Sequence, residues 1–238
     1  MVCLPTYDER ENLEPMVRAL GDVFAAHGLD GRVLVVDDAS PDGTGEIADR
    51  LAAELPHVDV LHRPAREGLG PAYVAGFGRA LSAGADLVLE MDCDFSHDPA
   101  DVPRLVAVAG EADVALGSRY VAGGAVRNWG ATRRVVSRAG CLYAQAILGL
   151  GVRDATSGFK CYRRQVLEAI ALERISSRGY AFQIETVYRA LRAGFSVREV
   201  PIVFTDRAEG GSKMGPGIVA EAIVRVPALR LAALRGRL

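Results

Sequence analysis

The first half of the chain alternates short apolar runs with longer segments in which apolar residues recur every three or four positions. The runs have the length of buried strands, and the periodic segments have the pattern of amphipathic helices. Such alternation is typical of a parallel sheet with helices on both faces. The pattern predicts strands near residues 1–5, 32–37, 58–62, 86–91 and 113–117, and helices near 9–27, 43–54, 69–83 and 99–109.

The second half is less regular. No run of about 18 uncharged apolar residues occurs, so no membrane-spanning helix is expected. The chain enters its first strand almost at once, so no signal peptide is expected either. The expected organisation is one domain over residues 1–217 followed by a C-terminal helix over 218–238. In the second half of the chain, the pattern predicts helices at 129–150, 181–193 and 218–235, strands at 158–162 and 197–204, and a loop at 205–217.

Charge divides the chain into two unlike parts. Residues 1–110 contain 8 basic and 20 acidic side chains, whereas residues 111–238 contain 20 and 10. The acidic half suits a metal ion, and the basic half suits anionic substrate groups or an anionic surface. The alternative is that the unequal charge of the two halves is an accident of surface composition. Nucleic acid is not expected as a partner, because the arginines are not interleaved with an aromatic platform.

The four cysteines are widely spaced and include no CxxC pair. This pattern indicates reduced thiols in an intracellular protein and argues against a disulfide framework or a zinc site. The residues are Cys3, Cys93, Cys141 and Cys161.

Carboxylates follow two of the predicted strands. Asp92 and Asp94 come after the run at 86–91, and Asp38 comes directly after the run at 32–37. Paired carboxylates suit a divalent cation that already bridges phosphates, and ligands of open α/β folds bind where parallel strands end. A solvated strand end is the alternative for Asp92 and Asp94. His97, just downstream, fits a structural hydrogen-bonding role better than a metal-binding one.

Other polar segments are candidates for binding a nucleotide and its phosphates. Pro5 stiffens the end of the first strand, Tyr7 offers a ring face to a base, and Glu9 can accept from base or ribose donors. A plain helix entry explains the same residues equally well. The glycines at 68 and 70 precede a predicted helix, as in a phosphate cradle or in ordinary helix-start geometry.

Basic residues of the second half are candidates for phosphate binding. Arg119 follows a predicted strand, and Arg207 and Lys213 lie in a glycine-rich segment that is able to close over a ligand. A flexible basic surface loop is the alternative for that segment. The last helix alternates apolar residues with arginines, which suits either an anionic membrane interface or ordinary packing with a solvated face.

Taken together, these segments resemble the polyprenyl-phosphate (dolichyl-phosphate) mannosyltransferases of glycosyltransferase family 2. The resemblance covers nearly the whole chain, and its ordered set of motifs is more specific than any single block, such as Asp92-x-Asp94-x-Ser96-His97-Asp98-Pro99. It implies an α/β fold of the GT-A nucleotide-diphospho-sugar transferase type, with a mostly parallel central sheet flanked by helices. The matching blocks are at 5–12, 36–44, 68–73, 91–99, 117–120, 156–159, 179–185, 199–204 and 206–213.

The resemblance implies a role for particular residues. Residues 1–110 would form the nucleotide and metal half, and 111–217 the acceptor half with a phosphate-binding loop. Arg133 and Ser137 match positions offered to the lipid phosphate. The implied guanosine contacts are Pro5, Tyr7, Glu9, Val36 and Asp38; the implied Mg or Mn ligands are Asp92, Asp94 and Ser96, with backbone from Cys93; the implied phosphate ligands are Arg119, Arg207 and Lys213; and Asp92, Asp94 and Arg119 would carry catalysis.

Some features depart from the family pattern. Asp8 replaces a common Asn, Phe95 a common Leu, and Arg66 a frequent Lys. Many relatives also have C-terminal transmembrane helices, which this chain lacks. The resemblance therefore implies a cytoplasmic protein that associates peripherally with the cytoplasmic face of the membrane, through its own surface or a membrane-anchored partner protein.

The implied reaction is the metal-dependent, inverting transfer of mannose from GDP-mannose to polyprenyl phosphate, which yields a β-linked mannosyl phosphate and GDP. Three alternatives stay open. One is a related family 2 enzyme that uses UDP-glucose or another acceptor. Another is a phosphatase with Asp92 as nucleophile, although Lys160 and Lys213 are the only lysines it could use. The third is a non-catalytic, membrane-associated module that binds a nucleotide sugar.

Overall fold

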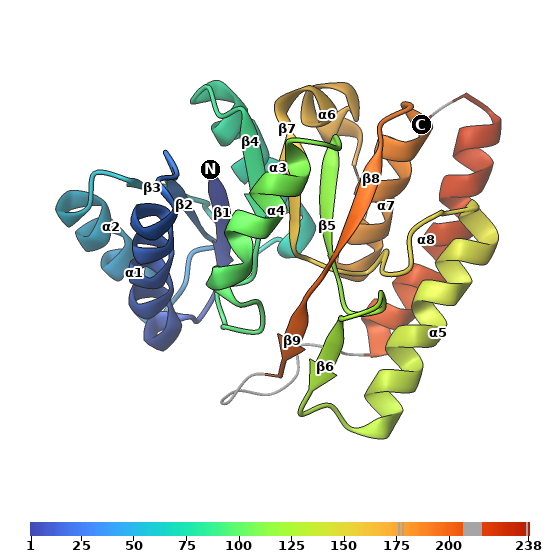
Figure 1. Ribbon diagram of the computed structural model, residues 1–238, viewed down its shortest axis with the longest axis horizontal. Coiled ribbons are helices and arrows are strands. Elements are labelled where there is room, and N and C mark those ends of the chain that lie inside the picture. Colours follow the sequence, from blue (N-terminus) through green and yellow to red (C-terminus); the bar gives the residue numbers. More distant parts are fainter. Residues whose placement is uncertain (176, 178, 207–215, 237) are drawn as a thin grey trace.

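The structure, a computed structural model, is built around one seven-stranded sheet with the strand order β3-β2-β1-β4-β7-β5-β8 (Figure 1). It describes residues 1–175, 177, 179–206, 216–236 and 238. Neighbouring strands pair in parallel except β7, which runs antiparallel to both β4 and β5. The predicted mostly parallel sheet is confirmed. The strands are β1 (Val2–Thr6), β2 (Val33–Asp37), β3 (Val58–His62), β4 (Leu87–Glu90), β5 (Val114–Ser118), β7 (Lys160–Arg163) and β8 (Val197–Pro201).

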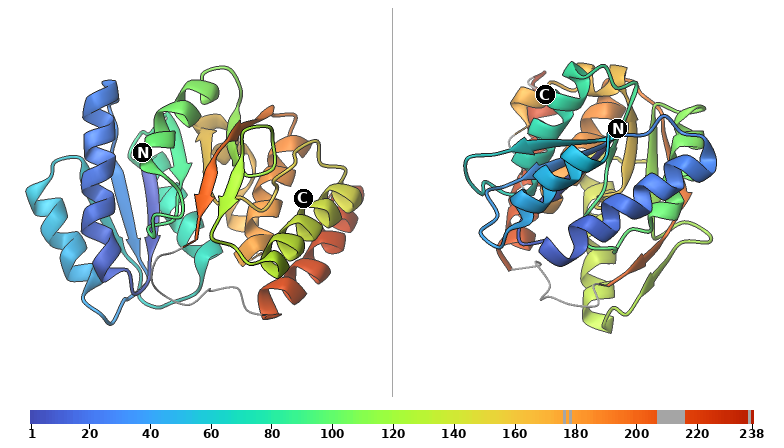
Figure 2. Two further views of the ribbon diagram at one scale, coloured as in Figure 1. Left: turned by 60° about the horizontal axis from the view of Figure 1, so that its bottom comes forward. Right: turned by 90° about the vertical axis from the view of Figure 1, so that its left-hand side faces the viewer.

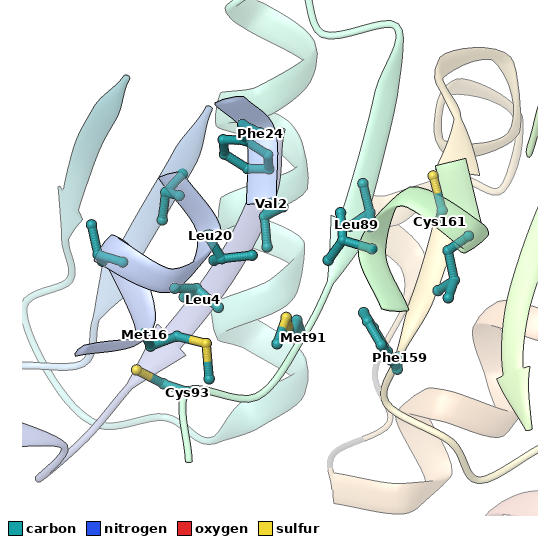
Figure 3. Close-up of a cluster of buried hydrophobic side chains, with 14 of the residues drawn as sticks. Val2, Leu4, Met16, Leu20, Phe24, Leu89, Met91, Cys93, Phe159 and Cys161 are labelled. Atoms are coloured by element: carbon teal, nitrogen blue, oxygen red, sulfur yellow. The ribbon is translucent and has the colours of Figure 1, made fainter. Parts of the chain in front are cut away.

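Helices cover both faces of the sheet (Figure 2). Because side chains alternate between the faces of a strand, Val2 and Leu4 pack on one side, with Leu13 and Met16 of α1. Cys3 points to the other side and packs with residues of α3 and α7. Figure 3 shows part of the first cluster. The helices are α1 (Arg10–His27), α2 (Thr44–Glu54), α3 (Leu69–Ser82), α4 (Val102–Ala109), α5 (Ala131–Leu148), α6 (Arg164–Ala169), α7 (Gly179–Arg192) and α8 (Pro216–Leu234), with 3-10 turns at Pro99–Asp101 and Leu172–Arg174.

The second half differs from the sequence prediction in one respect that shapes the site. The single strand predicted at 197–204 is two strands: β8 stays in the large sheet, whereas β9 (Val203–Thr205) pairs in parallel with β6 (Ala125–Arg127). Buried Ile202 lies at the break, where its N–H donates to the carbonyl of Ser118 and its carbonyl accepts from Ala125. Neither β6 nor α6 was predicted, because segments this short show no clear hydrophobic period.

The last helix, α8, packs against the rest of the chain. Its residues Val226, Leu229 and Ala233 are buried in a third core cluster that also contains Ile184 and Val187 of α7. Helix α5 lies beside α8 (Figure 1), and the Tyr143 hydroxyl donates to the carbonyl of Ile223 at 2.8 Å. Among the described residues, no helix has both the length and the apolar character needed to cross a membrane.

Candidate active site

A cavity of about 390 Å³ lies at the carboxyl ends of β1, β2 and β4. Helices α5, α7 and α8 and the segment around β9 close its other side. Two walls therefore meet at this cavity, one built by the amino-terminal strands and one by the carboxyl-terminal half. Its lining includes Pro5, Tyr7, Glu9, Asp38, Arg66, Asp92, Cys93, Asp94, Ser96, His97, Arg119, Arg133, Gly158, Gln183, Asp206 and Glu221.

The loop after β4 brings the predicted acidic pair into the cavity. Asp94 is buried, and one of its carboxylate oxygens accepts from the backbone N–H of Ser96 at 3.0 Å. Phe95 between them has a φ of 58°, a left-handed conformation that costs a non-glycine residue strain. Ser96 is buried too, and its Oγ has no hydrogen-bond partner in the described ranges of the chain. The loop thus presents two carboxylates and a buried hydroxyl to the cavity.

These groups fit a divalent cation that is shared with a phosphate ligand. Within the described part of the chain, no three His, Cys, Asp or Glu side chains cluster as a complete metal site. Mg²⁺ is commonly held by only one or two carboxylates, with water and substrate phosphates completing its oxygen ligands. Asp92, Asp94 and Ser96 form such a partial set. The side chain of Cys93 packs in the core near Met16 (Figure 3), so its backbone is what can face the cavity.

His97 belongs to the same loop and stabilises it from its buried side. It is buried between the rings of Phe159 and Phe204, whose centroids lie 4.9 and 5.2 Å from its own. Its Nδ1 accepts from the backbone N–H of Asp92 at 3.4 Å. Burial lowers the pKa of His97 to about 4, so the ring is neutral near pH 7 and can accept at Nδ1. Its contacts agree with the structural role expected from the sequence.

Tyr73 supports the same loop from helix α3. Its hydroxyl donates to a carboxylate oxygen of Asp92 at 3.5 Å. The sequence pattern did not predict this role for Tyr73, because an isolated tyrosine in an apolar helix is typical of a core residue.

Arg119 faces the cavity from the end of β5, where it pairs with a carboxylate that the sequence pattern does not predict. Its Nε and Nη2 donate to the two oxygens of buried Asp154 at 2.7 and 2.6 Å. Burial alone would lower the pKa of Arg119, but the charge of Asp154 and its hydrogen bonds together outweigh that effect and raise the pKa. Nη2 also donates to Thr156, which leaves Nη1 without a hydrogen bond to the described residues. A fixed cation therefore stands across the cavity from the acidic loop.

Arg133, in the first turn of α5, is the second cation of this wall. Its Nη1 donates to Asp206 at 2.6 Å, and its guanidinium lies 4.4 Å from the ring centroid of Trp129. Its Nε is buried and has no hydrogen-bond partner within the described part of the chain. Ser137, one turn further on, does not line the cavity; its hydroxyl accepts from the Tyr120 hydroxyl at 2.7 Å. The structure thus places Arg133 in the cavity wall and Ser137 behind it.

The residues expected at the nucleotide gather at the other end of the cavity. Arg66 lies over the ring of Tyr7, 3.9 Å from its centroid. Asp38 is buried and paired with Arg63. The Glu9 carboxylate accepts from Asn12 at 2.8 Å.

Two sets of predicted nucleotide and phosphate ligands are not among the cavity-lining side chains. Val36 is fully buried in the core of β2, so its side chain does not face the cavity. Arg207 and Lys213 lie outside the described residues.

Comparison with known proteins places these features in a family. The sequence model "Glycosyl transferase family 2" matches residues 1–171. An undecaprenyl-phosphate mannosyltransferase of Micrococcus luteus is 47% identical over 242 residues, which cover 100% of this chain and 98% of that protein. A polyprenol monophosphomannose synthase of Mycolicibacterium smegmatis is 48% identical over 240 residues, which cover 100% of this chain and 88% of that protein.

Solved structures show the same fold. Glucosyl-3-phosphoglycerate synthase from Mycobacterium tuberculosis, in complex with Mn²⁺, uridine diphosphate and phosphoglyceric acid, superposes with a TM-score of 0.72 at 18% identity. The match covers 96% of this chain and 77% of that one. The GT-A fold expected from the sequence is confirmed.

Proposed function

The chain belongs to glycosyl transferase family 2, and we propose that it transfers mannose from GDP-mannose to polyprenyl phosphate with inversion. One observation carries the proposal: a single cavity has Asp92, Asp94 and Ser96 on one wall and Arg119 and Arg133 on the other. The names of the two mannosyltransferase relatives support the sugar and the acceptor. The products would be β-linked mannosyl polyprenyl phosphate and GDP.

Mg or Mn is the cofactor that the acidic wall suits. Asp92, Asp94 and Ser96 would hold the ion beside the diphosphate of the donor, with backbone from Cys93. Bound there, it would stabilise the negative charge that builds up on the departing GDP. The Mn²⁺ complex of the solved structural relative agrees with a divalent ion in this fold.

The basic wall suits the acceptor. A phosphate monoester is ionised near neutral pH, so its oxygen can attack the anomeric carbon without a strong general base. A new bond from that oxygen to carbon forms as the bond from carbon to the GDP oxygen breaks, on the opposite face. Arg133, with its unpartnered Nε, is placed to hold the acceptor phosphate, and the Arg119 cation to offset charge during transfer. Ser137 would act through the position of α5 rather than by direct contact.

The nucleotide is assigned to the end of the cavity formed by β1 and β2. Tyr7 and Arg66 present a stacked pair of planar groups there, and Glu9 and Asp38 present carboxylates. Pro5 lines the cavity at the end of β1. Val36 would contribute backbone only, since its side chain is in the core. Arg207 and Lys213 remain predicted phosphate ligands on sequence resemblance alone.

Helices α5 and α8 suit contact with a membrane surface. Of the eight exposed large hydrophobic side chains in the described residues, seven lie on these two helices: Val135, Val136 and Leu142 on α5, and Ile223, Val224, Leu231 and Leu234 on α8. Exposed apolar side chains this concentrated on two adjacent helices are typical of an interaction surface. Arginines flank it on both helices, as in interfacial helices that lie on anionic lipid.

The same two helices reach the cavity, α5 through Arg133 and α8 through Glu221. A lipid held at this face would bring its phosphate toward Arg133. We therefore assign the chain to the cytoplasmic face of a membrane as a peripheral protein. Flotation of the pure chain with anionic vesicles tests this: binding that Val224→Ser with Leu231→Ser abolishes supports direct contact. No binding of the wild-type chain would transfer the role to a membrane-anchored partner protein.

The experiment that tests the reaction is a donor panel. The purified chain with Mn²⁺ and a short polyprenyl phosphate in detergent is given GDP-mannose or UDP-glucose, and the lipid product is identified by mass and by the configuration of its anomeric carbon. We expect β-mannosyl phosphate from GDP-mannose only. Glucosyl lipid would favour the related family 2 activity, and GDP-mannose binding without any product would favour the non-catalytic module. Release of inorganic phosphate without sugar transfer would favour the phosphatase.

A further inference from the structure

A buried ion pair lies directly behind the acidic wall, where none of the roles assigned above uses it. Lys160 of β7 and Glu90, the last residue of β4, are both completely buried. Lys160 Nζ donates to Glu90 Oε1 at 2.5 Å and to Oε1 of Gln183 on α7. A buried charge pair is retained only when its remaining hydrogen-bonding capacity is met, and Gln183 meets part of it for Lys160.

The contact with Lys160 fixes the orientation of the Gln183 amide. An ammonium group has only donors, so the carbonyl oxygen of the amide must face it and the NH₂ group must face away. Gln183 lines the cavity and is buried, yet its Nε2 has no hydrogen-bond partner among the residues that the structure describes. A buried amide donor without a partner destabilises a protein unless something supplies an acceptor.

The unpartnered donor lies next to the acidic loop. A Cβ atom at Gly158 would lie 3.3 Å from Gln183 Nε2 and 3.8 Å from a carboxylate oxygen of Asp92. It would also lie 3.8 Å from Cε1 of His97. Glycine therefore leaves open a space that any side chain would fill. A group that enters this space lies beside Asp92, the carboxylate assigned to the metal and the diphosphate. Since the sugar of a nucleotide sugar is bonded to the diphosphate, the sugar is the group expected there.

We propose that Gln183 Nε2 donates a hydrogen bond to a hydroxyl group of the donor sugar, and that Lys160 and Glu90 hold the amide in the orientation this requires. This inference rests on the proposed function, because it assumes a sugar nucleotide in the cavity. Gln183 would then be a specificity-determining residue. A site built to hydrogen-bond a hydroxyl rejects a sugar that lacks it, since its own buried donor is left unpaired.

The decisive variant is Gln183→Glu. It keeps the shape of the side chain and an oxygen toward Lys160, but it removes the NH₂ donor. We expect kcat/KM for GDP-mannose to fall about 100-fold, while the affinity for GDP changes by less than about threefold, because GDP lacks the contacted hydroxyl. Gln145→Glu is the matched control: it makes the same amide-to-carboxylate change at a residue of α5 outside the cavity lining, where the amide donates to the carbonyl of Arg153. We expect it to leave the ratio of the two affinities unchanged.

Deoxy analogues of GDP-mannose identify the partner. The wild-type enzyme should lose activity with one analogue, and Gln183→Glu should lose nothing further with that same analogue, since the interaction is already gone. An equal loss of GDP affinity in the variant would assign the donor to a diphosphate oxygen and overturn the proposal. The proposal would also be overturned if Gln183→Glu and the wild-type enzyme lost activity equally with every deoxy analogue.

A second variant covers the case in which Gln183→Glu does not fold. Gly158→Ala leaves the Lys160 network intact and places a methyl group against Nε2. It should weaken GDP-mannose more than GDP, and equal weakening of both would contradict the proposal. If the wild-type chain itself transfers no mannose, the proposed function fails instead, so the two failures are distinguishable.

Discussion

The two walls of the cavity are built in different ways. The first wall uses the ends of regular parallel strands, where Asp38, Asp92 and Asp94 collect because neighbouring strands end at the same edge. The second wall is assembled from pairs far apart in the sequence, Arg119 with Asp154 and Arg133 with Asp206. The acidic wall thus follows from fold class, whereas the basic wall depends on particular partners. Loss of a residue should therefore affect chemistry on the first wall and both chemistry and stability on the second.

The largest effect is expected on the acidic wall. Asp94→Ala should lower turnover by a factor on the order of 1,000 or more, because it removes a carboxylate that no other group replaces. The free energy of unfolding should change far less, since Asp94 lines the cavity in the loop that follows β4. Activity assays with urea unfolding measure both quantities.

Asp98→Ala is the control for that change. It removes the same charge from the same loop but lies outside the cavity, where Asp98 caps a short 3-10 turn by accepting from Ala100. Its cost should be about 1 kcal/mol of stability with activity retained. Near-normal activity in Asp94→Ala would contradict the assignment of the metal site.

The basic wall should respond in stability as well. Asp154→Asn leaves the buried Arg119 without its carboxylate and should destabilise the fold by about 3–5 kcal/mol. The double variant Arg119→Met with Asp154→Leu removes both charges and should recover most of that stability, while activity stays low. Urea unfolding of the three proteins checks this. Equal stability of Asp154→Asn and the wild type would show that the pair does not hold this wall together.

A selective effect is expected at Arg133. Arg133→Ala should raise KM for the lipid acceptor roughly 10- to 100-fold, the effect of losing a hydrogen bond to a charged group, and alter KM for GDP-mannose far less. Arg134→Ala is the neighbouring control, because Arg134 is exposed and its side chain donates to the backbone carbonyl of Trp129. A rise confined to the donor KM would move Arg133 to the nucleotide site.

The smallest effect is a dependence of stability on pH. His97 titrates near 4 in the folded protein, below the usual value of 6.5. The unfolded chain therefore binds more protons between these values, and stability falls as pH drops from about 6.5 through about 4, by an amount on the order of 1–3 kcal/mol. Unfolding of the metal-free protein measures it, and His97→Gln should show a flatter profile. Parallel profiles for the two proteins would assign the acid loss to other groups.

The difference between the walls also explains what the sequence could predict. The position of Asp92 and Asp94 at a strand end could be predicted, because the apolar run and the two carboxylates are adjacent in the chain. Asp154 gives no such signal, since its pairing with Arg119 requires β5 and the 150–157 segment to meet in space. Lys160 meets Glu90 because β7 enters the sheet antiparallel beside β4, a topology that hydrophobic periodicity does not encode.

Strand boundaries had a similar limit. The pattern at 197–204 predicts one strand, and the backbone there is extended as expected. The hydrophobic pattern does not show, however, that the last part of this segment pairs with β6 instead of continuing in the large sheet. That choice sets the position of the basic wall, because Thr205 donates to the carbonyl of Ser96 and Asp206 follows to meet Arg133.

Transfer of labelled mannose from GDP-mannose to a short polyprenyl phosphate, in the presence of chelator and after return of Mg or Mn, tests the joint action of the two walls most directly. We expect no product with chelator, full recovery with metal, and no recovery in Asp94→Ala at any metal concentration. Mannosyl lipid formed at an undiminished rate in chelator would contradict this expectation.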